Sequence, residues 1–377
     1  MSIKLSNFVN INIDYINSIA SSGAREVVAF LDDTTVTTRT LGISLTGGEA
    51  TWKNLGEFIA AFGEGHEEDA LADPMYPTVA CYFNNGGKKL HYVQFTTGTG
   101  VSLTTTIASL PSEEIVVCSN RDASDMYDAA IDAEAGKGID EKLFLSSITV
   151  ANIATDPFNG LGNACLKVGN PGCEMAIAAY LSRVNIDNST IQDYCFTAEV
   201  LNKVGSEVIT VIDNDATFNT IKSKGNLNCD VYMIGTDIRN YGGNTCGGID
   251  IVNYFVKIVL TQTLTVALVN VLRNKIKYDS IGLGIVSATI VDELNRYRNA
   301  GYFSYDKTWT GGDVYDDSGN YLVIANDTPL VFGYHLTILP FASLTAEDKR
   351  DHKLPKIYLY LADTYGVREI EITGRVI

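Results

Sequence analysis

Apolar and polar residues alternate strictly at both ends of the chain. Residues 9–15 have the sequence VNINIDY and residues 367–377 have the sequence VREIEITGRVI. A period of two predicts a half-buried β-strand at each end. Such a strand can complete its own domain or add to an open sheet edge of another chain, and the pattern leaves both alternatives open. The candidate inter-subunit strand contacts are the apolar residues of these two segments: Val9, Ile11, Ile13, Tyr15, Ile370, Ile372 and Val376.

Between the two ends, short apolar runs typical of strands alternate with apolar residues at helical spacing. Strands are predicted at 26–31, 90–95, 114–118, 143–150, 192–201, 208–212 and 227–235. Helices are predicted around 52–62 and at 124–135 and 173–184, and a buried segment is predicted at 77–83. This alternation predicts an α/β (α+β) fold in which layered mixed sheets pack against helices.

Four glycines within residues 241–248 predict a domain boundary. The elements predicted after this boundary are a long, mostly buried helix capped by Asp250, a helix at 285–300 that stops before Gly301, a hairpin around 317–320 and a strand at 356–361.

Composition places the chain among globular proteins. It has 377 residues, 46% hydrophobic and 19% charged, which is enough for two or three domains with a sizeable core. The start of the sequence predicts no secretory signal, because its apolar residues alternate instead of forming a run. The longest apolar stretch, residues 258–272, has 15 residues that include three Thr, one Gln and one Asn. It is too short and too polar to predict a membrane span.

The formal net charge is −17, and it is unevenly distributed. Residues 1–240 carry 15 Lys/Arg and 30 Asp/Glu, whereas residues 241–377 carry 13 and 15. A chain this acidic is a poor candidate for binding nucleic acid or an anionic membrane surface, since both require clustered cations. The nearly neutral second part can lie against a partner without a large charge penalty.

No motif predicts catalysis, a cofactor or a metal site. His66 opens a run similar to H-E-x-x-H, but Ala70 replaces the second His, and the run is interpreted as an exposed acidic loop. Asp313, Asp316 and Asp317 lack the spacing of a calcium loop and favour a hairpin turn. The seven cysteines form no C-x-x-C pair and are predicted to be reduced, mostly buried thiols. We therefore expect no catalytic, cofactor-binding or metal-binding residues, although an α/β enzyme whose site is assembled from distant residues remains an alternative.

Several stretches share one order with a known family. They are the strand at 9–13 with the linker after it, NTCGGID at 244–250 before the long helix, KYDSIG at 277–282 before the second helix, and SLTAEDKR at 343–350 followed by LPKI at 354–357. In this order the chain resembles the sheath proteins of contractile phage tails, the myophage sheath-like family. Residues 100–220 match least, and DHK at 351–353 replaces the Ala and Arg types expected there.

The resemblance implies a structural subunit, not an enzyme. Sheath subunits polymerise as stacked hexameric rings around the tail tube and contract to drive the tube through the host envelope. The implied partners are other copies of the chain, the tail tube protein, and the baseplate and tail terminator proteins, with no nucleic acid, no membrane insertion and no cofactor. The implied location is the virion tail, after synthesis in the bacterial host cytoplasm.

The resemblance also implies a division of the chain. The expected parts are an N-terminal strand and linker arm at 1–22, an acidic α/β outer domain at 23–240 with a possible insertion around 100–220, a tube-facing core sheath domain at 241–361 and a C-terminal strand arm at 362–377. Two alternatives stay open. One is the sheath of a tailocin or another contractile injection particle, and the other is a receptor- or carbohydrate-binding phage tail protein, which the Tyr, Thr and Asn content would fit.

Overall fold

The computed structural model describes residues 27–35, 41–96, 102–110, 115–119, 142–152, 161–183, 199–200, 211–212, 214–224, 227–234 and 237–362. The chain divides into two compact units. We call the first the α/β unit, which comprises residues 14–184, 193–259 and 366–377. The second, the C-terminal unit, comprises residues 1–13, 185–192 and 260–365. The boundary between Val259 and Leu260 falls inside helix α9 (Ile251–Arg273).

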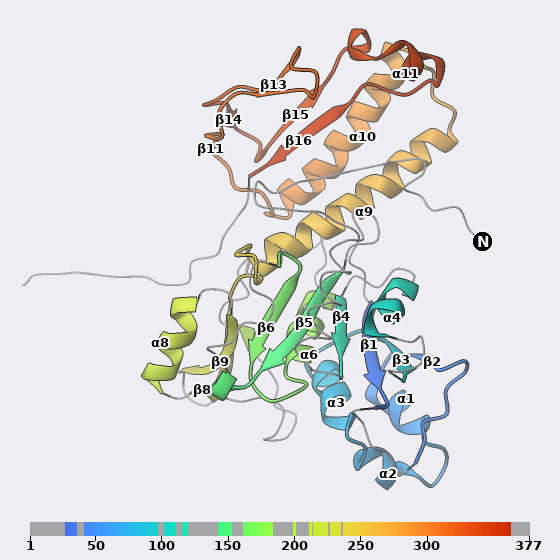
Figure 1. Ribbon diagram of the computed structural model, residues 1–377, viewed down its shortest axis with the longest axis vertical. Helices are drawn as coiled ribbons and strands as arrows, with labels where there is room; N and C mark the ends of the chain where they lie inside the picture. The colour runs from blue at the N-terminus through green and yellow to red at the C-terminus, as the bar shows by residue number, and fades with distance from the viewer. Residues whose placement is uncertain are drawn as a thin grey trace, which may run out of the picture. The chain divides into compact units, whose positions relative to one another are not determined.

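The α/β unit is built on one sheet (Figure 1). Its strands are β1 (Val27–Asp33), β2 (Glu49–Trp52), β3 (Lys89–Phe95), β4 (Ile115–Cys118), β5 (Leu143–Ile148), β6 (Ala164–Val168), β7 (Glu199–Val200), β8 (Val211–Ile212), β9 (Leu227–Ile234) and β10 (Asp237–Tyr241). Within the described residues the strand order is β2-β3-β1-β4-β5-β6-β9-β10-β7, and β8 pairs with β9. The strands from β3 to β9 in this order are parallel, whereas β2, β10 and β7 join through antiparallel pairs.

Continuous apolar strands explain why this sheet is parallel and covered on both faces. Val28 of β1 lies between Leu90 of β3 and Ile115 of β4, and all three side chains are fully buried. A strand covered on both faces needs apolar residues at successive positions, which is how parallel strands differ from strands with one solvated face. The α/β prediction is therefore confirmed in its central sheet.

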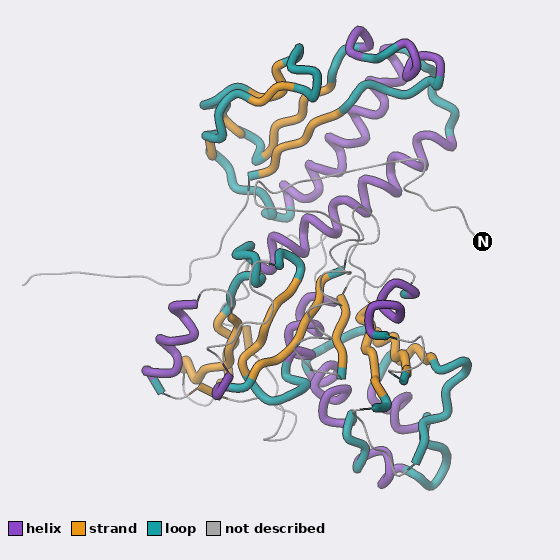
Figure 2. Tube along the Cα trace, in the orientation of Figure 1, coloured by secondary structure: helices purple, strands orange, loops and turns teal. Residues whose placement is uncertain are grey.

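Helices cover both faces of the sheet. They are α1 (Leu55–Ala60), α2 (Glu67–Leu71), α3 (Tyr76–Asn84), α4 (Leu103–Ser109), α6 (Glu174–Arg183) and α8 (Asp215–Lys224), with a short 3₁₀ turn at Val150–Asn152. Helices α3 and α6 pack against each other, and α6 contacts β1, β4 and β5. On the other face, Ile107 of α4 belongs to the same core cluster as Leu31 and Val116. Figure 2 shows this layered arrangement.

The C-terminal unit combines helices with small sheets. It contains the second part of α9, α10 (Ser280–Asn299), β11 (Lys307–Thr308), β12 (Val314–Tyr315), β13 (Leu322–Ile324), β14 (Pro329–Leu330), β15 (Tyr334–Ile338), a 3₁₀ turn at Phe341–Ser343, α11 (Ala346–Arg350) and β16 (Ile357–Leu361). The strands pair as β11–β14, β12–β13 and β15–β16.

The turn into α10 is specified by individual residues. The Asp279 carboxylate accepts hydrogen bonds from the N–H groups of Ile281 and Gly282, 2.9 Å each, which caps the helix. At position 282 a Cβ would lie 1.9 Å from the carbonyl oxygen of Lys277, so only glycine fits. At the far end Gly301, with φ +82°, stops the helix as the sequence predicted.

Helix α9 has the bounds that the sequence predicted, but its apolar part is longer than the stretch at 258–272. Residues 253–273 form a window of 21 residues with a mean hydropathy of 1.8, which by length and composition alone could cross a membrane. The prediction that this stretch is too short is therefore wrong. However, 56% of the window is buried inside the protein, as in the core helix of a globular domain. Asp250 caps α9 as expected, because its Oδ1 accepts a hydrogen bond of 3.2 Å from the N–H of Asn253.

Most of the predicted elements are confirmed to within a few residues, and two are corrected. The helical spacing that begins at Trp52 is misleading, because Trp52 ends β2 and the helix is α1. The segment 77–83 is buried as expected and forms α3, with Pro77 in the first turn where its missing N–H costs nothing. The acidic loop predicted at His66 is exposed but contains the single-turn helix α2. The predicted helix at 124–135 and the residues 192–198 lie outside the described residues.

Candidate assembly interface

The C-terminal unit ends in a two-stranded antiparallel sheet, β15–β16. Five residue pairs define its register: Tyr334↔Leu361, His335↔Tyr360, Leu336↔Leu359, Thr337↔Tyr358 and Ile338↔Ile357. Because side chains alternate along a strand, one face carries Tyr334, Leu336, Ile338, Ile357, Leu359 and Leu361, and the other carries His335, Thr337, Tyr358 and Tyr360. Every one of the ten residues is half-buried.

The polar face of this sheet is anchored to the neighbouring hairpin. Thr337 Oγ1 donates to the carbonyl oxygen of Val323 on β13 at 2.6 Å, and it lies 2.8 Å from His335 Nε2. The Tyr360 ring contacts Trp309 edge-on, with ring centroids 5.0 Å apart. At the start of β16, the Lys356 ammonium group forms an ion pair with the Asp317 carboxylate in the β12–β13 turn. The hairpin therefore orients β15–β16 from one side.

Aromatic rings connect the apolar face to helix α10. The ring of Tyr334 contacts Phe303 at a centroid distance of 6.2 Å, and Phe303 stacks on Tyr297 of α10 at 6.3 Å. The sheet is thus supported on both faces, although each face leaves its side chains partly accessible. A two-stranded sheet is marginal by itself and is normally completed by further strands.

Both edges of this small sheet carry main-chain groups that have no strand partner among the described residues. The N–H of Leu339 donates to the carbonyl of Lys356 at 3.0 Å, and the N–H of Ala362 donates to the carbonyl of Gly333 at 2.8 Å. Hydrogen-bonded pairs alternate along an antiparallel ladder, so the N–H and C=O groups of Leu336 and Leu359 point to the outer edges. The two edges are therefore templates onto which an extended segment can be added.

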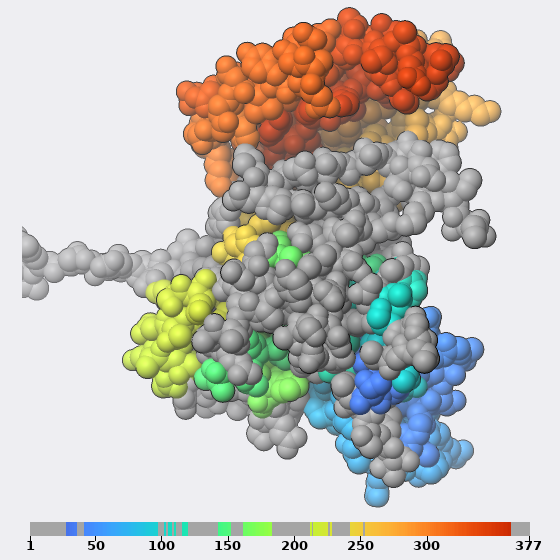
Figure 3. Space-filling model, in the orientation of Figure 1, coloured from blue at the N-terminus to red at the C-terminus, as the bar shows by residue number. Residues whose placement is uncertain are grey.

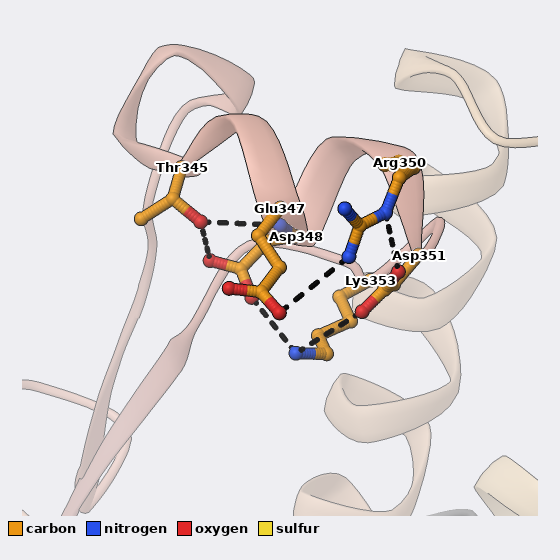
Figure 4. A network of polar contacts seen from close by, with 6 residues as sticks. All are labelled: Thr345, Glu347, Asp348, Arg350, Asp351 and Lys353. Atoms are coloured by element: carbon orange, nitrogen blue, oxygen red, sulfur yellow. Dashed lines mark hydrogen bonds and ion pairs between the residues drawn. The ribbon is translucent and has the colours of Figure 1, made fainter.

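A network of charged residues surrounds α11, which lies between β15 and β16 in the sequence (Figure 4). Lys353 Nζ lies 3.0 Å from Asp348 Oδ1 and 3.9 Å from Asp351 Oδ2. Arg350 contacts Glu347 at 3.5 Å and Asp351 at 3.3 Å. The residues that differ from the resembled family at 351 and 353 thus take part in the network. The segment lies on the outer surface of the unit (Figure 3), and the Arg350 side chain is 71% exposed.

Hydrogen bonds and charge lower the pKa of Asp348. The Thr345 hydroxyl donates to Asp348 Oδ2 at 2.6 Å and, with the Lys353 ammonium group, keeps the pKa of this carboxyl below its usual range. The hydrogen bond to the Asp348 carboxylate, together with its negative charge, raises the pKa of Lys353. All of these groups are exposed, so the network is worth little to stability and is weakened by salt.

The backbone after α11 adopts a left-handed conformation at a non-glycine residue. His352 has φ +53°, its N–H donates to the carbonyl of Lys349, and the N–H of Lys353 donates to the carbonyl of Asp348. This is a Schellman C-cap, a position that favours glycine. The His352 ring lies 5.1 Å from the ring of Tyr278, which in turn contacts Phe341. The aromatic contacts hold the chain reversal that leads from α11 into β16.

The predicted strand contacts Val9, Ile11, Ile13, Tyr15, Ile370, Ile372 and Val376 lie outside the described residues. The acceptor sheet itself was only half predicted. Strand β16 was expected with its bounds, whereas for β15 only the surroundings of His335 were interpreted as strand-like, although the sequence Tyr-His-Leu-Thr-Ile alternates between the two faces. This alternation of polar and apolar residues is the sequence signal from which β15 could have been predicted.

The other candidates from the sequence have structural roles in the part of the chain that the structure describes. The Asp316 carboxylate accepts from the Ser318 hydroxyl at 2.5 Å and from the main-chain N–H groups of Asn320 and Tyr321 at 2.8 Å each, which lowers its pKa and closes the β12–β13 turn. This confirms the hairpin interpretation. Within the described ranges no three His, Cys, Asp or Glu residues come together as a metal site, and the free cysteines there are buried.

Comparison with known proteins gives matches among solved structures. No protein-family model and no curated protein matches the chain. A chain in the cryo-EM structure of the anti-feeding prophage (AFP) baseplate, 6-fold symmetrised, is 13% identical with a TM-score of 0.62, covering 97% of this chain and 98% of that chain. In the contracted state of the AFP baseplate, a chain is 13% identical with a TM-score of 0.61, covering 100% and 99%.

A third structure is identified as a sheath. It is the cryo-EM structure of an extracellular contractile injection system, the PVC sheath complex in the contracted state, with 14% identity, a TM-score of 0.60 and coverage of 97% of both chains. At this level of identity the likeness concerns the fold, and the matches cover 97% or more of the chain. The chain therefore has the fold of a contractile-sheath protein.

Proposed function

We propose that this chain is a structural subunit of a contractile sheath. It polymerises as stacked rings around an inner tube and contracts to drive the tube through the envelope of a target cell. The observation that carries the proposal is that each structural match covers 97% or more of this chain and 97% or more of the matched chain. A shared α/β domain alone would support many functions, whereas these matches extend over nearly the whole chain.

The strand arms and the open sheet provide the connectivity that such an assembly needs. In this proposal the terminal strands at residues 9–15 and 367–377 add to the outer edges of β15 and β16 in neighbouring subunits. Main-chain hydrogen bonds then hold the lattice together, while the alternating side chains fix the register. The nearly neutral part of the chain, residues 241–361, faces the tube, and the acidic part faces solvent.

The particle is proposed to be either an injection particle or a phage tail. Because the PVC sheath belongs to an extracellular contractile injection system, we favour that class over a myophage virion. Electron microscopy of particles purified from the source culture distinguishes the two classes. Headless contractile tails support an injection particle, whereas DNA-filled capsids on the same tails support a phage.

Negative-stain electron microscopy of the purified full-length chain, alone and with its tube protein, tests the sheath function. Hollow cylinders with stacked rings are expected. Truncations lacking residues 1–20 or 367–377 should remain folded by circular dichroism but fail to assemble. Normal cylinders from both truncations would exclude strand donation. Discrete particles that bind glycans saturably, with no cylinders even in the presence of tube protein, would replace the sheath function with receptor binding.

A further inference from the structure

A groove at the turn between α9 and α10 is lined by apolar and cationic residues. Its volume is about 450 Å³, and it lies wholly within the C-terminal unit. The lining includes Val271, Ile276, Ile281 and Ile285 together with Lys275 and Lys277. The volume falls in the range of about 300–1,000 Å³ that is typical of binding pockets. The groove is therefore large enough to accept an apolar side chain from a partner.

The apolar part of this groove is unusually accessible. Ile281 is 67% exposed and is the most exposed large apolar side chain in the described part of the chain. Leu272 and Ile285, on the two helices beside it, are 42% and 44% exposed. Scattered exposed apolar residues need no explanation, but Ile281 and Ile285 line one concave surface, which is typical of a protein contact.

The cations beside the groove form no ion pair with any described residue. Arg273, Lys275 and Lys277 occur within five residues, and the nearest acidic residue in sequence, Asp279, is used as the cap of α10. Lys275 has φ +54°, a conformation that glycine would adopt more easily. The groove thus presents positive charge next to apolar surface, and it fits a partner segment with acidic residues around an apolar side chain.

The chain itself contains a segment with this complementary chemistry. Helix α2 carries Glu67, Glu68 and Asp69, follows Glu64 and ends at Leu71. Leu71 is 50% exposed, the highest value for a large apolar residue among the described residues of the α/β unit. The most exposed apolar side chain of one unit is therefore flanked by acids, and that of the other unit is flanked by bases.

We propose that the α9–α10 groove of one copy binds helix α2 of a second copy, with Leu71 against Ile281 and Ile285 and the α2 carboxylates against Lys275 and Lys277. The two surfaces differ, so the contact is heterologous and propagates from copy to copy into a ring or a helical array. It differs from strand addition because it uses side chains and charge instead of main-chain hydrogen bonds. It does not require the sheath function.

Charge reversal with complementation tests this contact in the full-length chain. The variants are Lys275→Glu/Lys277→Glu in the groove and Glu67→Lys/Glu68→Lys on α2. Each alone should self-associate roughly tenfold more weakly at low salt by sedimentation velocity, because several exposed ion pairs are reversed together. An equimolar mixture of the two should recover association, since each copy then meets an oppositely charged surface. Lys53→Glu/Lys224→Glu, with the same charge change at other exposed sites, should behave like the parent chain.

The apolar half of the contact has its own variant. Leu71→Asn leaves every charge in place and should weaken self-association in the same assay. Failure of the mixture to recover association, or equal association of the groove variant and the Lys53/Lys224 control, would overturn the proposal. Loss of tube-protein binding by the groove variant with unchanged self-association would assign the groove to the tube instead. Recovery in the mixture without any cylinder formation would retain this contact and reject the sheath function.

Discussion

Replacement of Leu359 by proline tests directly whether the outer edge of β16 is paired in the assembly. The register places Leu359 opposite Leu336, at a position where the main-chain N–H points away from β15. Proline is tolerated in edge strands when its missing N–H faces solvent. Leu359→Ala is the matched control, because it removes much of the same side chain and keeps the N–H.

The structure sets the expected magnitudes. Leu359 is half-buried, so either substitution should lower the free energy of unfolding by about 1–2 kcal/mol, below the usual cost for a fully buried leucine. The two variants should then agree within about 1 kcal/mol in urea denaturation. A strand that adds to the β16 edge forms one main-chain hydrogen bond fewer with the proline variant. This loss is worth about 1 kcal/mol, or roughly a fivefold weaker contact, and the proline ring also displaces the carbonyl group of the added strand.

Assembly should therefore separate the two variants where stability does not. Leu359→Ala should still form cylinders in negative stain, and Leu359→Pro should not. Leu336→Pro makes the same change on the outer edge of β15 and shows which edge is used. Equal assembly of Leu359→Pro and Leu359→Ala would refute the assignment of the β16 edge as a strand acceptor, and assembly by both proline variants would refute it for the whole sheet.

Three further predictions concern stability. Burial raises the pKa of Tyr297. The contribution of this tyrosine to folding stability is therefore complete below the unfolded-state pKa of about 10 and is lost as the pH rises further. Tyr297→Phe should lose less stability than the parent between pH 9 and 11 in urea titrations, and equal losses would contradict this. Gly247→Ala should destabilise by about 1–3 kcal/mol, because the new Cβ would lie 2.7 Å from the main-chain Cα of Gly162, whereas Gly42→Ala meets nothing within 4 Å and should not. Thr337→Val should cost about 1 kcal/mol in thermal unfolding, because its hydroxyl donates to the main chain of β13; an unchanged midpoint would show that His335 supplies the bond alone.

The central sheet could be predicted because its signal is local. The runs Glu-Val-Val-Ala-Phe-Leu at 26–31 and Glu-Ile-Val-Val-Cys at 114–118 are apolar at successive positions, as a strand buried on both faces requires. The segment at 77–83 is equally apolar and forms a helix. A short apolar run does not distinguish a buried strand from a buried helix, because both bury all of their side chains.

The candidate interfaces were harder to predict because distant residues form them. Strand β15 has only five residues, and its half-burial depends on the hairpin that ends 10 residues earlier at Ile324 and on Tyr297 of α10. The groove exists because the turn at 274–279 brings Lys275 beside Ile281 and Ile285. The partners of the terminal strands belong to other chains in the proposed assembly, and a single sequence contains no record of them beyond the alternation itself.

The two proposed contacts would respond differently to contraction. A sheath that switches between two packings must keep some contacts and exchange others. Strand addition on β15–β16 is suited to persist, because main-chain hydrogen bonds depend on register and not on which side chains a rotating neighbour presents. Docking of α2 in the α9–α10 groove is suited to exchange, since exposed ion pairs are individually weak and are screened by salt. If this division holds, raising the ionic strength should favour the switch between packings while the subunits remain connected.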